Sequence, residues 1–163
     1  MTLLDWSGRL IAAACLGVMF VALFVNVVLR YAFGSGIAWA YEIHALLLPW
    51  LVAGGIVIAA ARGRNIAITL LPDLLSASGR RVLTLLIHLV IVLIATSVLW
   101  SSQPILKAAQ FQTLSTLGIK QIWGYASLVF AFGAMSVIGV VEIVRLLAGG
   151  DPDPLDLERQ SLG

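Results

Sequence analysis

Charged residues are absent from long stretches of this 163-residue chain, and these gaps constrain the fold more than any other feature. The first gap runs from Leu10 to Leu29. A helix that rises about 1.5 Å per residue needs about 20 apolar residues to cross a hydrocarbon core of about 30 Å. The gaps therefore predict an all-α integral membrane protein with four spanning helices. Their approximate bounds are residues 10–29, 43–61, 82–101 and 123–146, the last with two charges near its end.

The composition supports helices that face lipid. Apolar residues make up 61% of the chain and charged residues 11%, whereas globular domains have about 45–50% and about 25%. The apolar runs do not alternate with polar residues, which excludes a transmembrane β-barrel. The composition also excludes a soluble enzyme, a nucleic-acid-binding protein and a disordered scaffold. The single Cys15 excludes a disulfide framework and a multi-cysteine metal site. We therefore expect no enzymatic activity, no cofactor and no nucleic-acid partner.

Lysine and arginine near the span ends predict the orientation of the chain. Four spans place both termini on one side of the membrane. That side carries Arg9, Arg62, Arg64, Arg80, Arg81, Arg145 and Arg159, whereas the opposite side carries Arg30, Lys107 and Lys120. Because basic residues accumulate on the cytoplasmic side, we expect both termini in the cytoplasm. The first apolar run is too long for the core of a signal peptide, so we expect it to remain as a helix.

The segments between the spans are too short to form a further domain. We predict one membrane domain over residues 1–148 and an acidic, disordered cytoplasmic tail over residues 149–163. The middle cytoplasmic loop, residues 62–81, has the apolar pattern of an interfacial helix interrupted by Pro72. The second outer loop, residues 101–122, is moderately apolar and is a second candidate for an interfacial helix.

Two histidines raise the question of haem ligation. His44 opens the second span at the outer face, and His88 lies six residues into the third span from the inner face. The two rings are therefore expected to differ by about 20 Å in depth, which one metal cannot bridge. We expect an interfacial His44 and a His88 that hydrogen-bonds to a neighbouring helix.

A proton-coupled carrier needs a carboxylate within the membrane. Glu42 and Glu142 lie at span ends, and the middle of each span has no acidic residue. This absence argues against independent transport. A self-contained four-helix carrier or a membrane haem protein stays as the alternative function.

The charges at span ends have competing interpretations. Arg30 follows Asn26 by four residues, so the two share one helix face. Arg30 either pairs with Glu42 and pins the first outer loop, or binds a lipid headgroup or a partner subunit. Glu142 and Arg145 have the spacing of a local ion pair. Two pairs of small residues have the i, i+4 spacing that lets helices approach closely, namely Ala13 with Gly17 and Gly55 with Ala59.

Two motifs resemble one family of membrane proteins. The first is the stretch Asn26 to Phe33, followed by Trp39, Glu42 and the Gly54–Gly55 pair. The second is the stretch Ser115 to Ile119, followed by Trp123, Tyr125 and Gly133. Together they resemble the DctQ-like small membrane subunit of TRAP (tripartite ATP-independent periplasmic) transporters, over residues 5–147. The family often has a His-Ile-x-Val-Asp pattern after the second span, where this chain reads Asn-Ile-Ala-Ile-Thr at residues 65–69.

The resemblance implies a supporting role in the inner membrane of a bacterium. A large multi-span subunit would move the substrate, an organic acid and commonly a carboxylate, together with sodium ions. A periplasmic solute-binding protein would deliver the substrate. This chain would scaffold the large subunit and help to dock the binding protein through residues 34–41 and 114–123. The residues implied as contacts with these partners or with membrane lipid are Asn26, Arg30, Tyr31, Trp39, Glu42, Ser115 and Trp123.

Overall fold

The computed structural model describes residues 2–61 and 77–149, which form five helices. They are α1 (Thr2–Phe33), α2 (Trp39–Ala61), α3 (Ala77–Ser101), α4 (Gln103–Ala109) and α5 (Ile122–Leu147). Four helical segments are long and apolar enough to cross a membrane, the third of them running through α3 and α4 over Ser78–Ala109. The prediction of an all-α protein with four spanning helices is confirmed.

Helix α1 extends well beyond the span predicted from the charges. It begins at Thr2 and ends at Phe33, whereas the prediction was 10–29. Asp5 and Arg9 lie one turn apart in α1 and form an ion pair of 2.9 Å, so charges in the first turns do not interrupt the helix. Charged residues therefore mark where the apolar span ends, but they do not mark where the helix ends.

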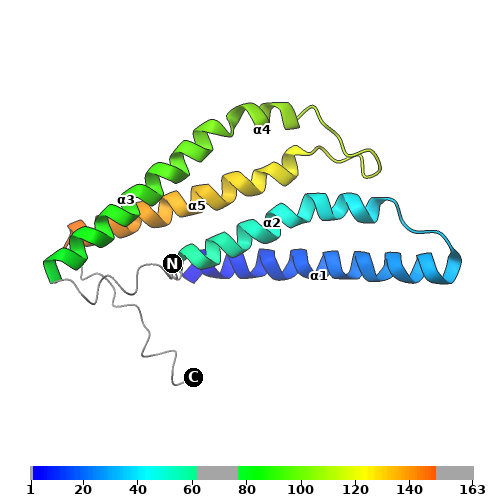
Figure 1. Cartoon of the computed structure of the whole chain (residues 1–163), viewed down its shortest axis with the longest axis horizontal. Coiled ribbons are helices and arrows are strands. Elements are labelled where there is room, and N and C mark those ends of the chain that lie inside the picture. Colours follow the sequence, from blue (N-terminus) through cyan, green and yellow to red (C-terminus); the bar gives the residue numbers. More distant parts are fainter. Residues whose placement is uncertain (1, 62–76, 150–163) are drawn as a thin grey trace, which may run out of the picture.

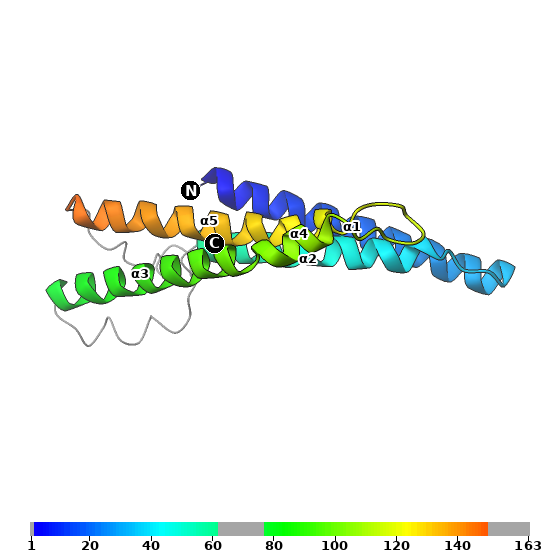
Figure 2. The same ribbon diagram turned by 90° about the horizontal axis from the view of Figure 1, so that it is seen from above.

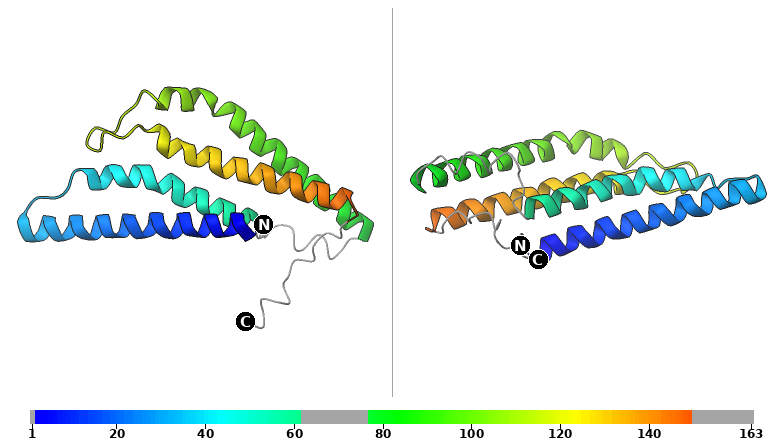
Figure 3. Two further views of the ribbon diagram at one scale, coloured as in Figure 1. Left: turned by 180° about the vertical axis from the view of Figure 1, so that it is seen from behind. Right: turned by 60° about the horizontal axis from the view of Figure 1, so that its bottom comes forward.

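The long helices lie side by side in the order α1, α2, α5, α3 (Figure 1). Each inner helix packs on two neighbours, α2 on α1 and α5, and α5 on α2 and α3. Views from above and from behind show the helices running along a common axis (Figures 2 and 3). Such a row leaves an open face on every helix.

One end of this row carries both connections that are described. We call it the loop end and define it as residues 30–42 and 101–122. The first part joins α1 to α2, and the second contains α4 and the segment that leads into α5 (Figure 1). The other end holds the first residue of α1 and the last residue of α5.

The most deeply buried apolar side chains are small. Among the described residues, those exposed by 2% or less are all alanine apart from Val57. Membrane helices gain little from moving apolar surface out of lipid, so they associate through small residues that let backbones approach. Alanine-rich contacts of this kind are typical of helices that assemble inside a bilayer.

Helices α1 and α2 approach each other closely at Gly8 and Gly54. A β-carbon at Gly54 would lie 2.7 Å from the Gly8 carbonyl oxygen, and one at Gly8 would lie 2.9 Å from the Gly54 carbonyl oxygen. The other small residues with this spacing, Ala13, Gly17, Gly55 and Ala59, are all exposed, so they do not mark a close contact between helices within the described residues. Spacing identifies small residues on one helix face, but it does not reveal which face meets a neighbour.

Aromatic side chains join α2 to α5. The Trp50 indole N–H donates a hydrogen bond of 2.8 Å to the backbone carbonyl of Trp123. The Trp50 ring also packs against Phe130 with ring centroids 5.9 Å apart. Pro49 lies inside α2 and removes one backbone hydrogen bond, which is a common cause of a bend. Figure 1 shows α2 bending along its course.

Two predicted segments fall largely outside the described residues. The interfacial helix predicted for the middle loop covers residues 62–81, of which 62–76 are not described. The acidic tail, residues 149–163, is described only at Gly149. In the second outer loop, the helical part is α4, which follows α3 directly after Ser102.

Candidate functional site

The residues implied by the sequence gather at or near the loop end. Arg30, Tyr31, Trp39 and Glu42 lie on the facing ends of α1 and α2, and Ser115 lies in the loop before α5. Asn26 is one turn below Arg30, and Trp123 is in the first turn of α5. The fold thus brings these residues to one region of the protein, and their role as contacts with a partner or with lipid stays a prediction.

The Glu42 carboxylate connects α2 to the loop before α5. It accepts hydrogen bonds from the Thr116 backbone N–H at 3.0 Å and 2.9 Å, one to each oxygen, and from the Leu117 N–H at 2.9 Å. Hydrogen bonds between a carboxylate and backbone N–H groups are stronger than those between neutral groups. Glu42 thereby holds a segment that is more than 70 residues distant in the sequence.

The loop that Glu42 holds has its own backbone hydrogen bonds. Leu114 donates to Ile119 at 2.9 Å, Gly118 donates to Leu114 at 2.9 Å, and Gln121 donates to Gln112 at 2.9 Å. Gly118 has a φ of +64°, a conformation that glycine adopts at little cost. These hydrogen bonds close residues 112–121 into a compact loop. Ser115 is exposed in this loop.

Asn26 fixes the connection between α1 and α2. Its side chain is 4% exposed, and its Oδ1 accepts a hydrogen bond of 2.6 Å from the Ile37 backbone N–H. A β-carbon at Gly36 would lie 3.0 Å from the same oxygen, so glycine at this position lets the chain pass close to Asn26. The asparagine is therefore a structural anchor of the turn, and its burial leaves it no surface for a partner.

We expect Asn26→Leu to destabilise the connection between α1 and α2. The Ile37 N–H would lose its acceptor at a partly buried position, which costs about 2 kcal/mol. The thermal unfolding midpoint in detergent, followed by size-exclusion chromatography, should fall by about 5 °C. Val27→Leu is the matched control, because Val27 is the next residue and is exposed. Equal midpoints for the two variants would show that the Asn26 contact contributes nothing.

Arg30 and Tyr31 are exposed at the end of α1. Tyr31 is 86% exposed, and Arg30 is exposed as well. The predicted Arg30–Glu42 ion pair is wrong for the described residues, because the Glu42 carboxylate bonds to the Thr116 and Leu117 amides. The other interpretation, that Arg30 contacts a lipid or a partner, stays a prediction. The local pair of Glu142 and Arg145 is confirmed at 3.9 Å.

The two histidines bond to their own helices. His44 Nδ1 lies 2.6 Å from the Ala40 carbonyl oxygen, and His88 Nδ1 lies 2.9 Å from the Thr84 carbonyl oxygen. The prediction that His88 bonds to a neighbouring helix is therefore wrong, because its ring bonds to the carbonyl one turn earlier in its own helix. Over residues 2–61 and 77–149, no cluster of three or more His, Cys, Asp or Glu side chains could hold a metal ion.

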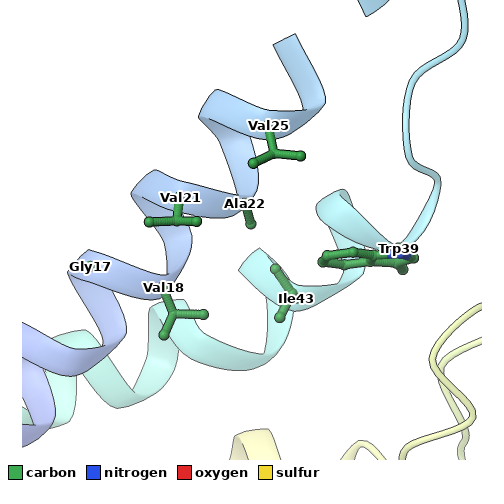
Figure 4. A pocket seen from close by; sticks show the side chains of 7 residues that line it. All are labelled: Gly17, Val18, Val21, Ala22, Val25, Trp39 and Ile43. Atoms are coloured by element: carbon green, nitrogen blue, oxygen red, sulfur yellow. The ribbon is translucent and has the colours of Figure 1, made fainter. Parts of the chain in front are cut away.

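An apolar groove lies between α1 and α2 near the loop end (Figure 4). Its volume is about 320 Å³. Helix α2 contributes Trp39 and Ile43, and the other lining residues, Gly17, Val18, Val21, Ala22 and Val25, belong to α1. The groove is lined by apolar side chains and so offers no group for catalysis.

Sequence reasoning missed the partners of Glu42. These partners are backbone N–H groups, which every residue except proline carries, so residue identity gives no signal for them. It also missed Gly8, which lies against α2 at Gly54. The Gly8 contact has a weak signal in the sequence, since Gly8 lies one turn before Ala12, but the partner helix cannot be inferred from that spacing.

Comparison with known proteins identifies one family. The model of the DctQ component of tripartite ATP-independent periplasmic transporters matches residues 19–149. A Haemophilus influenzae protein named "Putative TRAP transporter small permease protein" is 35% identical over 75 residues, which are 46% of this chain and 47% of that protein. A Sinorhizobium fredii protein named "Uncharacterized protein y4mM" is 33% identical over 76 residues, 46% of this chain and 14% of that protein. The matched region thus spans about half of the first relative and a smaller part of the second.

Proposed function

This chain belongs to the DctQ family of tripartite ATP-independent periplasmic transporters, and from that premise we propose that it acts as a membrane scaffold for a large transport subunit. It is a transporter component of the small permease type, with four helices suited to a membrane. The scaffold role, the place of the chain in the bacterial inner membrane and the cytoplasmic position of both termini are parts of this proposal.

The open row of helices is the observation that carries the proposal. A carrier must surround its substrate with protein during passage. In the described part of the chain, the helices pack in single file and leave their faces open. Large apolar side chains are exposed along these faces, including Phe20, Phe24 and Leu93. In a membrane such faces meet lipid or another membrane subunit, so a substrate path would have to be supplied by a partner.

The polar residues agree with a role beside such a partner. Among the described residues the acidic side chains are Asp5, Glu42 and Glu142, and each lies near the end of a helix. Asp5 and Glu142 bond to arginines, and Glu42 bonds to backbone N–H groups. A carboxylate poised in mid-membrane, which proton or sodium coupling would use, would therefore have to belong to the large subunit.

The transported substrate is proposed as an organic acid, carried with sodium ions by the large subunit. A periplasmic solute-binding protein would bring this acid to the loop end. That end is the natural docking surface, because two independent contacts hold its parts in place. Asn26 anchors the connection between α1 and α2, and Glu42 anchors the loop before α5. The surface therefore has a defined shape before a partner binds.

Co-purification and transport together test this function. An affinity-tagged form of this chain should retain the large subunit through purification in mild detergent. In liposomes, this chain alone should move no carboxylate, and both membrane subunits with the binding protein should give sodium-dependent uptake. Carboxylate uptake by this chain alone would overturn the scaffold role, and so would full uptake by the large subunit without it.

A further inference from the structure

Basic side chains at the loop end lack acidic partners. Arg30, Lys107 and Lys120 are all exposed. None of them forms an ion pair within the described residues, since the pairs there involve other arginines. At the opposite end, Arg9 and Arg145 each pair with an acid on the same helix. Among the described residues, the loop end therefore has three basic side chains without an ion pair, whereas Arg9 and Arg145 at the opposite end are paired.

The loop end also lacks acidic residues that could balance these cations. Glu42 is the one acidic residue in the sequence over residues 30–42 and 101–122. Both of its carboxylate oxygens accept hydrogen bonds from backbone N–H groups. The Glu42 carboxylate is therefore already occupied by these backbone groups. With three basic residues and one acidic residue, the loop end has a net positive charge.

Aromatic side chains accompany these cations. Tyr31 follows Arg30 in α1, and Phe111 lies four residues after Lys107 and is 83% exposed. Tyrosine and arginine are common among the residues that dominate the energy of protein interfaces. Exposed cations and exposed rings at the loop end therefore suit a partner surface that is acidic and partly apolar.

From this pattern we infer that the loop end docks an acidic face of the substrate-delivering binding protein, with Arg30, Lys107 and Lys120 steering its approach. The inference rests on the proposed function and adds the charge of the partner surface. Complementary charge acts mainly on the rate of association, because it guides two proteins together before close contact forms. Anionic lipid headgroups would also attract these cations, so the test includes them.

The test compares four forms of the complete membrane complex in nanodiscs of phosphatidylcholine. The first is wild type. The second is the neutral triple variant Arg30→Gln, Lys107→Gln and Lys120→Gln. The third is the charge-conserving triple variant Arg30→Lys, Lys107→Arg and Lys120→Arg. Surface plasmon resonance measures association of the binding protein with each form. Arg145→Gln, at the opposite end of the row, is the control for loss of a cation elsewhere.

We expect the neutral variant to associate about tenfold more slowly than wild type at low ionic strength. The difference should disappear at 1 M salt, where the screening length is about 3 Å. The charge-conserving variant and Arg145→Gln should associate like wild type. An equal rate and an equal salt dependence for the neutral variant would overturn the inference. So would a selective loss of binding to phosphatidylglycerol vesicles with docking unchanged, which would assign the cations to lipid.

Co-purification of the large subunit, measured on the same samples, separates the two levels of failure. If the wild-type complex does not form, the proposed function and this inference fall together. If the complex forms and the binding protein docks equally well on all variants, the inference alone is wrong.

Discussion

Gly54→Leu is expected to force α1 and α2 apart and to destabilise the row of helices. A β-carbon at residue 54 would lie 2.7 Å from the Gly8 carbonyl oxygen and 3.2 Å from both the Ala12 backbone nitrogen and its β-carbon. Two of these atoms belong to the backbone of α1, so no side-chain rotation can relieve the clash. Overpacking of this kind costs about 3 kcal/mol. The thermal midpoint of the purified chain should therefore fall by roughly 10 °C.

Gly55→Leu is the matched control for this variant. The substitution is the same and lies one residue further along α2, where a β-carbon would meet no atom within 4 Å. Its midpoint should change by less than about 2 °C. A similar loss for both variants would mean that the effect comes from leucine in this helix and not from the contact between α1 and α2.

The second large effect is expected for Glu42→Ala. This change removes both oxygens that hold Thr116 and Leu117, so the loop before α5 loses its attachment to α2. The amides of these two residues should then exchange with deuterium as fast as those of an open loop. Because the loop forms part of the proposed docking surface, binding-protein affinity and transport should fall on the order of tenfold.

Two further variants make the Glu42 result specific. Glu42→Gln keeps one carbonyl oxygen as an acceptor and should have an intermediate effect. Glu142→Ala removes an acid whose partner is Arg145 at the other end of the row, and it should leave docking unchanged. Normal exchange protection of the Thr116 amide in Glu42→Ala would contradict the role of Glu42 as the attachment of the loop.

The glycine pair illustrates how far sequence reasoning reaches. Gly54 and Gly55 are adjacent and chemically identical, and the motif contains both. Successive residues of a helix point about 100° apart, so one glycine can face α1 while the other faces outward. The choice depends on where α1 lies, and the hydrophobic pattern cannot reveal it because every side of these helices is apolar.

The charged residues near the loop end show the same limit. Arg30 and Glu42 are close in the sequence and opposite in charge, so a pair between them was a reasonable prediction. The fold instead brings residues 116 and 117 to Glu42, because α2 packs against α5 and the loop before α5 then lies beside the start of α2. Arg30 is left exposed at the end of α1.

The sequence by itself determined that this protein has four membrane-suited helices, and its two motifs indicated the family that the comparison confirmed. Both results depend on local patterns: uninterrupted apolar length fixes a span, and residues in a given order fix a motif. Only the tertiary structure decided that the helices form an open row, that Gly8 meets Gly54, and that Glu42 holds a distant loop. These contacts depend on which faces of uniformly apolar helices meet. In lipid that choice follows from the close fit of small residues and backbone groups, which sequence periodicity does not encode.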